Sequence, residues 1–304
     1  METRKKKVAV IGALNVDTGG WADSPLARGD SIPGRVRSSL GGVGWNIARN
    51  CALLGAETAF FSLLGKDEHE NAILADSARF GVSLANCRWE ERQNNRYLYI
   101  CDERGDVAAA VNDMALCGRI SPDLAACWLP ALEDCGAVVV DANLPEETLA
   151  FLGGHVKAPL AADCVSAAKS VRLRPILSRL SLLKANRVEA QALTGLVRPL
   201  DAARALLDAG VKRVTISLGR EGVLWAEGKT FLRQNPINTH PVDATGAGDS
   251  LTAALAVGLA AGLSMARCAE LGVAAAGVTI AHTGAVSSEL ARLGRDLLQA
   301  ANPE

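Results

Sequence analysis

Short apolar runs alternate with amphipathic segments along much of the chain. Near-continuous apolar strands separated by helices indicate a parallel sheet covered on both faces, and right-handed crossovers then give a doubly wound α/β fold. The helical spacing of apolar positions predicts helices over residues 46–54, 69–80, 173–180 and 201–209. The apolar runs predict strands over residues 7–12, 58–64, 137–141, 160–163, 180–184 and 214–218.

Two regions interrupt this alternation. Residues 15–40 hold glycines and prolines between short alternating runs, and residues 94–114 have a turn between two strand-like runs, which is a hairpin signal. Because neither region fits a helix that covers a sheet, we expect both to form a small β lid on a single domain spanning residues 1–304. Three successive helices are predicted after Pro241, over residues 247–263, 265–282 and 287–301.

The composition is that of an ordinary globular protein. Apolar residues make up 49% and charged residues 21% of the 304 positions, which excludes disordered and fibrous chains. The 32 Lys and Arg residues balance 33 Asp and Glu residues, so a nucleic-acid binder that works through bulk charge is disfavoured. The aromatic content of 4% also disfavours single-strand binding by base stacking.

The cysteines and the longest apolar run bear on the cellular compartment. None of the eight cysteines forms a C-x-x-C pair or has zinc-finger spacing, so we expect free thiols in a reducing cytosol. The longest apolar run, residues 251–263, is about 13 residues long and too short to cross a bilayer. These features predict a cytoplasmic protein without a membrane or nucleic-acid partner.

The segment from Asp243 to Asp249 carries the clearest chemical signal. Its two glycines precede a predicted helix, whose first amides and dipole favour an anion. A carboxylate at such a site would repel phosphate, so Asp249 needs another reason to be there. A catalytic base beside the anion site is one interpretation, and a simple helix cap is the other.

Asn186 and Glu189 are spaced to share one face at the start of a helix. Their oxygens could hold a water-bound Mg²⁺ ion, or they could simply begin the helix. The chain has no G-x-x-x-x-G-K-[ST] segment, and no G-x-G-x-x-G follows the first strand, which argues against a Rossmann dehydrogenase. The histidines form no spaced pair, and we interpret the tryptophans as packing residues.

Four segments in order resemble the ribokinase-like (PfkB) carbohydrate kinases. Asp243–Asp249 is similar to the D-T-x-G-A-G-D signature of that family, with Ala244 where Thr is frequent. Residues 41–46 are similar to its G-G-x-x-x-N signature. Residues 186–189 match its N-x-x-E motif, and residues 217–222 match its nucleotide-edge loop. The resemblance covers residues 8–290 and implies a ribokinase-like fold and an ATP- and Mg²⁺-dependent kinase.

The resemblance also implies roles for individual residues. Asp249 would be the base, with an anion hole formed by the amides of Gly246, Ala247 and Gly248. The acceptor sugar would contact Asn15, Asp17, Gly41, Gly42 and Asn46. ATP would contact Asn186, Ser217, Gly219, Gly222, Gly246, Gly248, Gly272 and Ala276, and Mg²⁺ would bind at Asn186 and Glu189. A K⁺ site would involve Asp243, Thr245, Thr279, Gly284 and Ser288.

Two further segments resemble the branch of the family that acts on pseudouridine. Residues 163–169 are close to its D-P-V-S-x-x-K segment, with Cys164 in place of Pro, and residues 111–114 form the second segment. Val43 stands where ribokinase has Lys. A nucleobase needs matching polar groups, and the candidates are Asn95, Asn112, Asp113, Ser166 and Lys169.

These candidates also have simpler interpretations, since Asn112 and Asp113 suit a turn and Lys169 suits a solvated helix.

The resemblance to the pseudouridine branch implies phosphorylation of the 5′-hydroxyl of pseudouridine to pseudouridine 5′-phosphate. Ribose, fructose or a purine nucleoside is the alternative acceptor, and a non-catalytic sugar- or nucleoside-binding protein is the alternative class. A homodimer that pairs its lids would bury the exposed strand edges.

Overall fold

The computed structural model describes residues 7–237 and 240–300 and contains, over those residues, a nine-stranded main sheet. Every neighbouring pair from β13 to β6 is parallel, whereas β14 and β15 form an antiparallel hairpin at the other edge. The strand order is β15 (Thr230–Gln234), β14 (Val223–Glu227), β13 (Arg213–Ser217), β12 (Leu180–Asn186), β11 (Leu160–Asp163), β10 (Ala137–Asp141), β1 (Lys7–Ile11), β4 (Glu57–Phe61) and β6 (Val82–Ser83).

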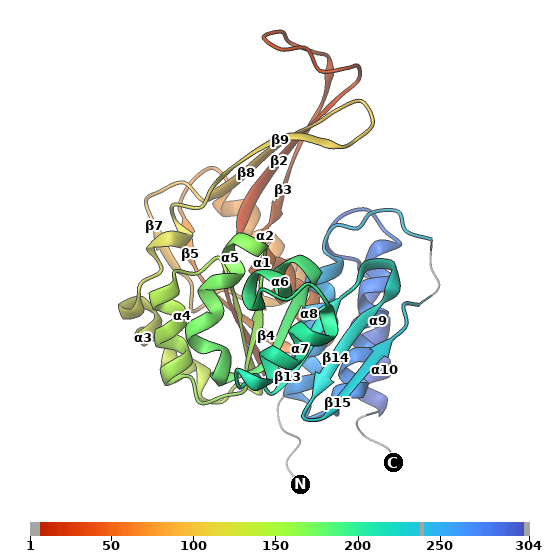
Figure 1. Cartoon of the computed structure of the whole chain (residues 1–304). Helices are drawn as coiled ribbons and strands as arrows, with labels where there is room; N and C mark the ends of the chain where they lie inside the picture. The colour runs from red at the N-terminus through yellow and green to blue at the C-terminus, as the bar shows by residue number, and fades with distance from the viewer. Residues whose placement is uncertain (1–6, 238–239, 301–304) are drawn as a thin grey trace.

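Helices cover both faces of this sheet, which confirms the doubly wound α/β prediction (Figure 1). In β1, Ala9 and Ile11 pack into one layer, and the alternate residues Val8 and Val10 pack into the other. The first layer holds α3 (Pro122–Leu132), α4 (Glu146–His155), α6 (Arg187–Thr194) and α7 (Pro199–Asp208). The second holds α1 (Val43–Leu53), α2 (Glu70–Phe80), α8 (Ala247–Ala260), α9 (Met265–Ile280) and α10 (Leu290–Ala300).

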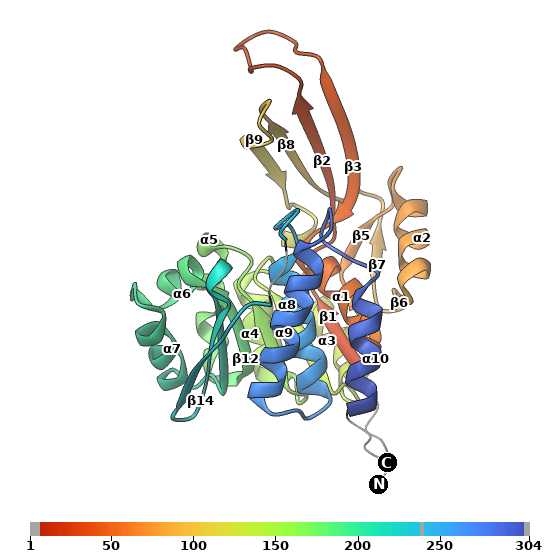
Figure 2. The same cartoon turned by 90° about the vertical axis from the view of Figure 1, so that its right-hand side faces the viewer.

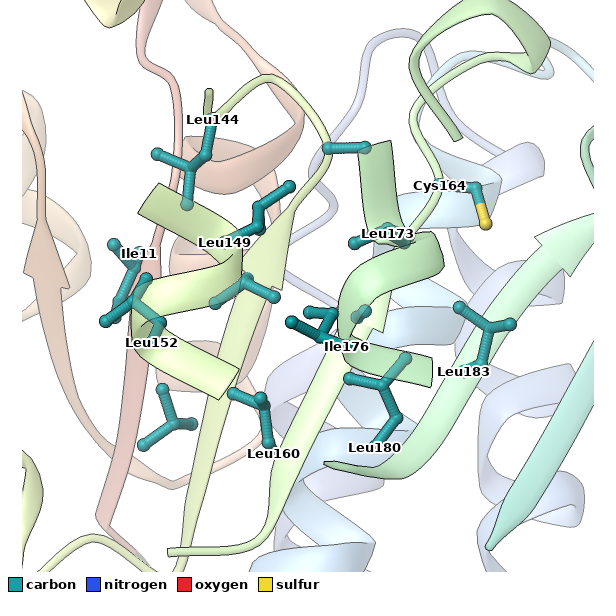
Figure 3. Packing of buried hydrophobic residues seen from close by; sticks show 14 of the residues in the cluster. Ile11, Leu144, Leu149, Leu152, Leu160, Cys164, Leu173, Ile176, Leu180 and Leu183 are labelled. Carbon is teal, nitrogen blue, oxygen red and sulfur yellow. The ribbon is translucent and has the colours of Figure 1, made fainter. Parts of the chain in front are cut away.

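Most predicted elements are present, and the differences have local causes. The helix expected over residues 173–180 is a 3₁₀ helix, Val171–Arg179, which follows the short α5 (Ala167–Ser170). With three residues per turn, Leu173 and Ile176 face the sheet together, beside α4 (Figure 3). The three predicted C-terminal helices are α8, α9 and α10; α10 begins at Leu290, and residue 301 lies outside the described residues.

A small sheet of four strands stands beyond the main sheet (Figures 1 and 2). Its order among the described residues is β3 (Gly34–Gly41), β2 (Asn15–Ala22), β8 (Asn95–Cys101) and β9 (Val107–Asp113). The pairs β2–β3 and β8–β9 are antiparallel, and β2 and β8 join them in parallel. The two irregular regions of the sequence therefore form one small sheet, as predicted.

Two strand pairs were not indicated by apolar periodicity. One is β5 (Leu63–Gly65) with β7 (Arg88–Glu90), which form a separate two-stranded sheet, and the other is the β14–β15 hairpin at the edge of the main sheet. All eight cysteines lie in the described residues as free thiols, as expected. Over residues 7–237 and 240–300, no helix is both long and apolar enough to span a bilayer.

Candidate active site

The start of α8, where the anion site is predicted, lies at the carboxyl edge of the main sheet. Gly246 precedes the helix with φ 76°, and a Cβ there would overlap Ala285 Cα, so both conformation and space require glycine. The Ser250 amide donates to the Gly246 carbonyl at 2.9 Å. The amides of Ala247 and Gly248 belong to the first helical turn, whose N–H groups have no partner within the helix. The Ala247 amide makes one long contact outside the helix, to the Ala244 carbonyl at 3.4 Å.

Asp249 lies in the first turn of α8 but does not cap it. The cap position is Gly246, and Asp249 Oδ2 instead accepts a hydrogen bond from Asn46 Nδ2 of α1 at 2.7 Å. Burial, followed by the charge of Asp163, raises the pKa of Asp249 to about 7. A carboxylate with such a pKa is suited to accept a proton near neutral pH, which favours the base interpretation over the cap.

A buried lysine lies beneath this site. Lys184 Nζ pairs with Asp163 Oδ2 at 3.2 Å, with the two side chains 7% and 2% exposed, and a Cβ on Gly248 would lie 2.8 Å from that nitrogen. Thr252 Oγ1 also donates to Asp163 at 2.6 Å. Burial lowers the pKa of Lys184, but the charges of Asp163, Glu189 and Asp249 outweigh burial and raise it overall.

Lys184 was not among the predicted site residues. Its signal is a lysine near the end of an otherwise apolar strand, two residues before Asn186. A charged side chain at such a position is buried only when charged partners accompany it.

Asp17 and Asn15 provide unsatisfied acceptors at the root of the small sheet. Within the described residues, Asp17 Oδ1 and Asn15 Oδ1 are buried without a hydrogen-bond partner. A Cβ on Gly41 would overlap Asp17 Oδ2, so this glycine makes room for the carboxylate, and Gly42 next to it precedes α1. Burial raises the pKa of Asp17 to about 6, while Arg49 lowers it. The two free oxygens suit the hydroxyl groups of a ligand.

A cavity of about 620 Å³ lies between one face of the small sheet and the loop before α8. Tyr97 and Tyr99 stack with ring centroids 5.4 Å apart, and Trp21 meets Tyr99 edge-on at 5.6 Å. Trp21 thus packs against Tyr99, and it also lines the cavity, on the same strand face as Gly19 and Asp17. The lining is Asp17, Trp21, Arg35, Arg37, Tyr97, Tyr99, Cys101, Gly105, Val107, Asp243, Thr245 and Thr283.

Two predicted base contacts are wrong. Asn95 is buried; its Nδ2 donates to the Leu14 carbonyl and its Oδ1 accepts from the Cys117 amide, each at 2.9 Å. Asp113 pairs with Arg96, on the face of the sheet opposite the cavity, and its carboxylate accepts from the Ala115 amide at 3.0 Å. Both side chains are engaged with the backbone.

Asn112, Ser166 and Lys169 remain compatible with a ligand. Asn112 pairs with Tyr97, so the two side chains share the cavity face. Lys169 is half-buried and donates to Asn143 Oδ1 at 2.6 Å, and burial lowers its pKa, so it is not a solvated surface charge. Ser166 precedes α5 without a side-chain cap bond.

The predicted nucleotide residues occupy the neighbouring strand ends. Asn186 and Glu189 form a reciprocal capping box at the start of α6. Ser217 ends β13 and donates to the Ala185 carbonyl at 3.4 Å, and Gly219 and Gly222 flank the next turn.

On α9, Ala276 is half-buried and Gly272 is buried, and their predicted contacts with ATP stay a prediction. A Cβ on Gly272 would overlap Leu251 Cδ1, so this glycine lets α9 pack closely on α8.

Comparison with known proteins identifies the family. The model of the pfkB family of carbohydrate kinases matches residues 5–292. The chain belongs to this family. Among curated proteins, it is 33% identical to the pseudouridine kinase of Escherichia coli over 261 residues, covering 83% of each chain. It is 27% identical to the guanosine-inosine kinase of Exiguobacterium acetylicum over 289 residues, covering 91% of this chain and 95% of that protein.

Solved structures confirm the ribokinase-like α/β fold of this pfkB-family chain. A carbohydrate kinase from Agrobacterium tumefaciens is 29% identical with a TM-score of 0.82, over 95% of this chain and 97% of that one. The ribokinase of Arabidopsis thaliana, solved with ribose and ATP, is 23% identical with a TM-score of 0.84, over 96% and 99%. The protein is therefore a phosphotransferase acting on an alcohol group of a small sugar or nucleoside, and kinases of this family use ATP.

The residues present fit the metal ions that the resemblance implies. Asn186 and Glu189 offer oxygen atoms, and the described residues hold no group of three His, Cys, Asp or Glu that could enclose a metal, so a Mg²⁺ ion would keep mostly water ligands. Asp243 accepts from the Thr245 and Gly284 amides, each at 2.9 Å.

For K⁺, the best fit is the buried Thr279 Oγ1, which has no partner within the described residues. Ser288 is exposed in the turn before α10.

Proposed function

We propose that this pfkB-family kinase transfers the γ-phosphoryl group of ATP to the 5′-hydroxyl of pseudouridine. The observation that carries the proposal is the cavity in which Asp17 lies on the same sheet face as Trp21, Tyr97 and Tyr99. Aromatic faces suit a flat base, and the carboxylate suits ribose hydroxyls. The similarity to a pseudouridine kinase over most of both chains supports the same choice.

In the proposed reaction, Asp17 and Asn15 hold the ribose and leave its 5′-hydroxyl facing Asp249. Asp249 accepts the hydroxyl proton while the oxygen bonds to the γ-phosphorus and the bond to the ADP oxygen breaks. The amides of Gly246, Ala247 and Gly248 stabilise the charge on the transferring group, and Lys184 adds a positive charge beneath them. Ser217, Gly219 and Gly222 would border the nucleotide.

Asn186 and Glu189 would hold Mg²⁺, which neutralises phosphate charge when bound. Glu189→Gln is expected to raise the Mg²⁺ concentration for half-maximal rate by about tenfold, because a charged partner of the hydrated ion is lost. The amide oxygen of Gln can still accept from the Asn186 amide, so the start of α6 should persist. Magnesium titrations of the rate, beside a thermal melt of each protein, measure this; an unchanged titration curve would contradict the metal role.

The acceptor test compares pseudouridine, uridine, ribose, fructose, guanosine and inosine at equal concentration, with ATP consumption as readout. Pseudouridine has a ring N–H that uridine lacks, and a buried acceptor facing that N–H would be left unpaired by uridine. We expect kcat/KM for pseudouridine to exceed that for uridine by roughly 10- to 200-fold. Asn112→Ala and Lys169→Ala should lower this ratio without changing ATP binding. Equal or faster turnover of ribose, fructose or a purine nucleoside would contradict the substrate.

A phosphorylated sugar is a second candidate, since Arg35 and Arg37 also line the cavity. Guanidinium groups bind phosphate well, so fructose 6-phosphate belongs in the same panel. If Arg35→Ala and Arg37→Ala lower turnover of that sugar phosphate but not of pseudouridine, the anionic acceptor is favoured.

The remaining expectations stay predictions. The outer face of the small sheet exposes the side chains of Val36, Leu98, Ile100 and Val111, which supports pairing of two lids in a homodimer. The lid would close over the acceptor and exclude water. The cytoplasmic location also stays a prediction.

A further inference from the structure

Arg49 is a buried cation beside the candidate base. The residue is 8% exposed, and its guanidinium lies between α1, α2 and the root of the small sheet. One terminal nitrogen donates to Asp76 Oδ2 at 3.1 Å. The other donates to Asn46 Oδ1 at 2.6 Å and to the Leu40 carbonyl of β3 at 3.0 Å. Arg49 therefore joins the small sheet to the amide that contacts Asp249.

The contact with Arg49 determines which end of the Asn46 amide faces Asp249. Because Asn46 Oδ1 accepts from the guanidinium, Nδ2 points to Asp249 Oδ2. An N–H donor stabilises a carboxylate, whereas an amide oxygen in the same place would stabilise the protonated acid. The orientation of one amide thus favours the ionised form of Asp249.

The guanidinium itself is held on several sides. Asp76 Oδ2 also accepts from Trp45 Nε1 at 2.9 Å, which orients the carboxylate that anchors Arg49. The Arg49 Cζ atom lies 5.8 Å from the Trp45 ring centroid and 5.5 Å from that of Phe80. Because the Arg49 guanidinium is restrained in this way, it can hold the neighbouring Asn46 amide in one orientation.

We propose that Arg49 is a positioning residue for phosphoryl transfer: it fixes the Asn46 amide so that an N–H group faces Asp249, and it ties this arrangement to Leu40 of the small sheet. The proposal rests on the proposed role of Asp249 as the base. It concerns no contact between Arg49 and substrate.

Other charged groups face the same two side chains. The charges of Asp163 on β11, Lys184 on β12 and Asp141 on β10 also act on the pKa of Asp249. Arg49 is also influenced by Asp76 on α2 and Asp17 on β2. These groups stay in place in the variants below. Because Arg49 also lowers the pKa of Asp17, a shifted acid limb is assigned to Asp249 only if the limb is absent when Asp249→Asn is added to the same variant.

The test is the pH profile of kcat/KM for pseudouridine, which reports the base in the free protein. Arg49→Met should move the acid limb upward by about one pH unit and lower kcat/KM about tenfold below that limb, with recovery at high pH. Arg79→Met is the matched control: Arg79 is exposed, and its Cζ lies 5.1 Å from the same Phe80 ring. Its profile should match that of the unmodified protein.

Arg49→Lys tests the orientation of the Asn46 amide while the positive charge at residue 49 is kept. It also provides a test if Arg49→Met does not fold. It keeps the positive charge but loses the planar group that bonds Asn46, Leu40 and Asp76 together. We expect the acid limb to move upward here too, by less than in Arg49→Met. A Lys variant that melts normally and whose profile superimposes on that of the unmodified protein would overturn the positioning role.

A double variant tests whether Arg49 acts through Asn46. If it does, Arg49→Lys should add little to the loss caused by Asn46→Ala, whereas additive losses would contradict the proposal. The proposed function fails by a different result. If Asp249→Asn keeps its activity, Asp249 is not the base. If Asp249→Asn is inactive but the pH profiles of the Arg49 variants are unshifted, only the positioning role of Arg49 is contradicted.

Discussion

Asp249→Asn is expected to lower kcat by about 10²- to 10⁴-fold, because the side chain keeps its shape but can no longer accept the hydroxyl proton. The amide oxygen of the replacement can still accept from Asn46 Nδ2, so the contact between α1 and α8 should persist. Binding of the acceptor should be nearly unchanged, since Asp17 and Asn15 supply the ribose contacts in the proposed function.

Saturating rates of ATP consumption and calorimetric binding of the acceptor measure the two effects separately. Asp208→Asn is the matched control, because Asp208 is exposed at the end of α7. Near-normal turnover by the Asp249 variant at saturating acceptor would contradict the assignment of the base.

The unmodified protein should show the corresponding pH dependence. Burial raises the pKa of Asp249 to about 7, so its ionised fraction falls as the pH drops through that value. A base acts in its ionised form, and the rate should therefore fall on the acid side. In Asp249→Asn this limb should vanish from the residual rate. A limb that persists in the variant would belong to another group, such as Asp17 or Asp141, each with a pKa of about 6.

The fold was predictable because the main strands are nearly continuous apolar runs. Parallel strands buried on both faces have this pattern, and β1, β10 and β11 differ from the predicted ranges by at most one residue. The β14–β15 hairpin was not predicted, since β15 is largely exposed and carries little apolar signal. The 3₁₀ helix at Val171–Arg179 was mistaken for an α-helix because both periods bring residues three apart onto one face.

Residues of the candidate site could be predicted from the sequence where the local backbone permits only one residue type. Gly246 is an example, because its positive φ and its close approach to Ala285 both require glycine. The bond from Asn46 to Asp249 was not predictable from spacing, since 203 positions separate the two residues. Asp113 could have been rejected earlier: in a strand, it must face away from its neighbour Asn112.

Lys184→Met is expected to lower the free energy of unfolding by about 3–5 kcal/mol, the usual loss when one partner of a buried ion pair is removed. Asp163 would stay buried with its Thr252 and Val165 hydrogen bonds but without the neutralising ammonium group. Asp249 and Glu189 would lose the same positive charge. A loss of this size is a large part of the stability of a typical protein, so the transition should move markedly in urea.

Lys157→Met is the matched control for this variant. Lys157 pairs with Glu133 at 2.9 Å, but the two side chains are 80% and 59% exposed. Exposed ion pairs contribute about 0–1 kcal/mol, so this change should hardly move the urea transition. In the folded fraction of Lys184→Met, the rate at saturating ATP should also fall, because the positive charge beneath the amides of α8 is gone. Equal urea midpoints for the two variants would contradict the prediction, because the buried ion pair of Lys184 would then contribute no more to the free energy of unfolding than the exposed pair of Lys157.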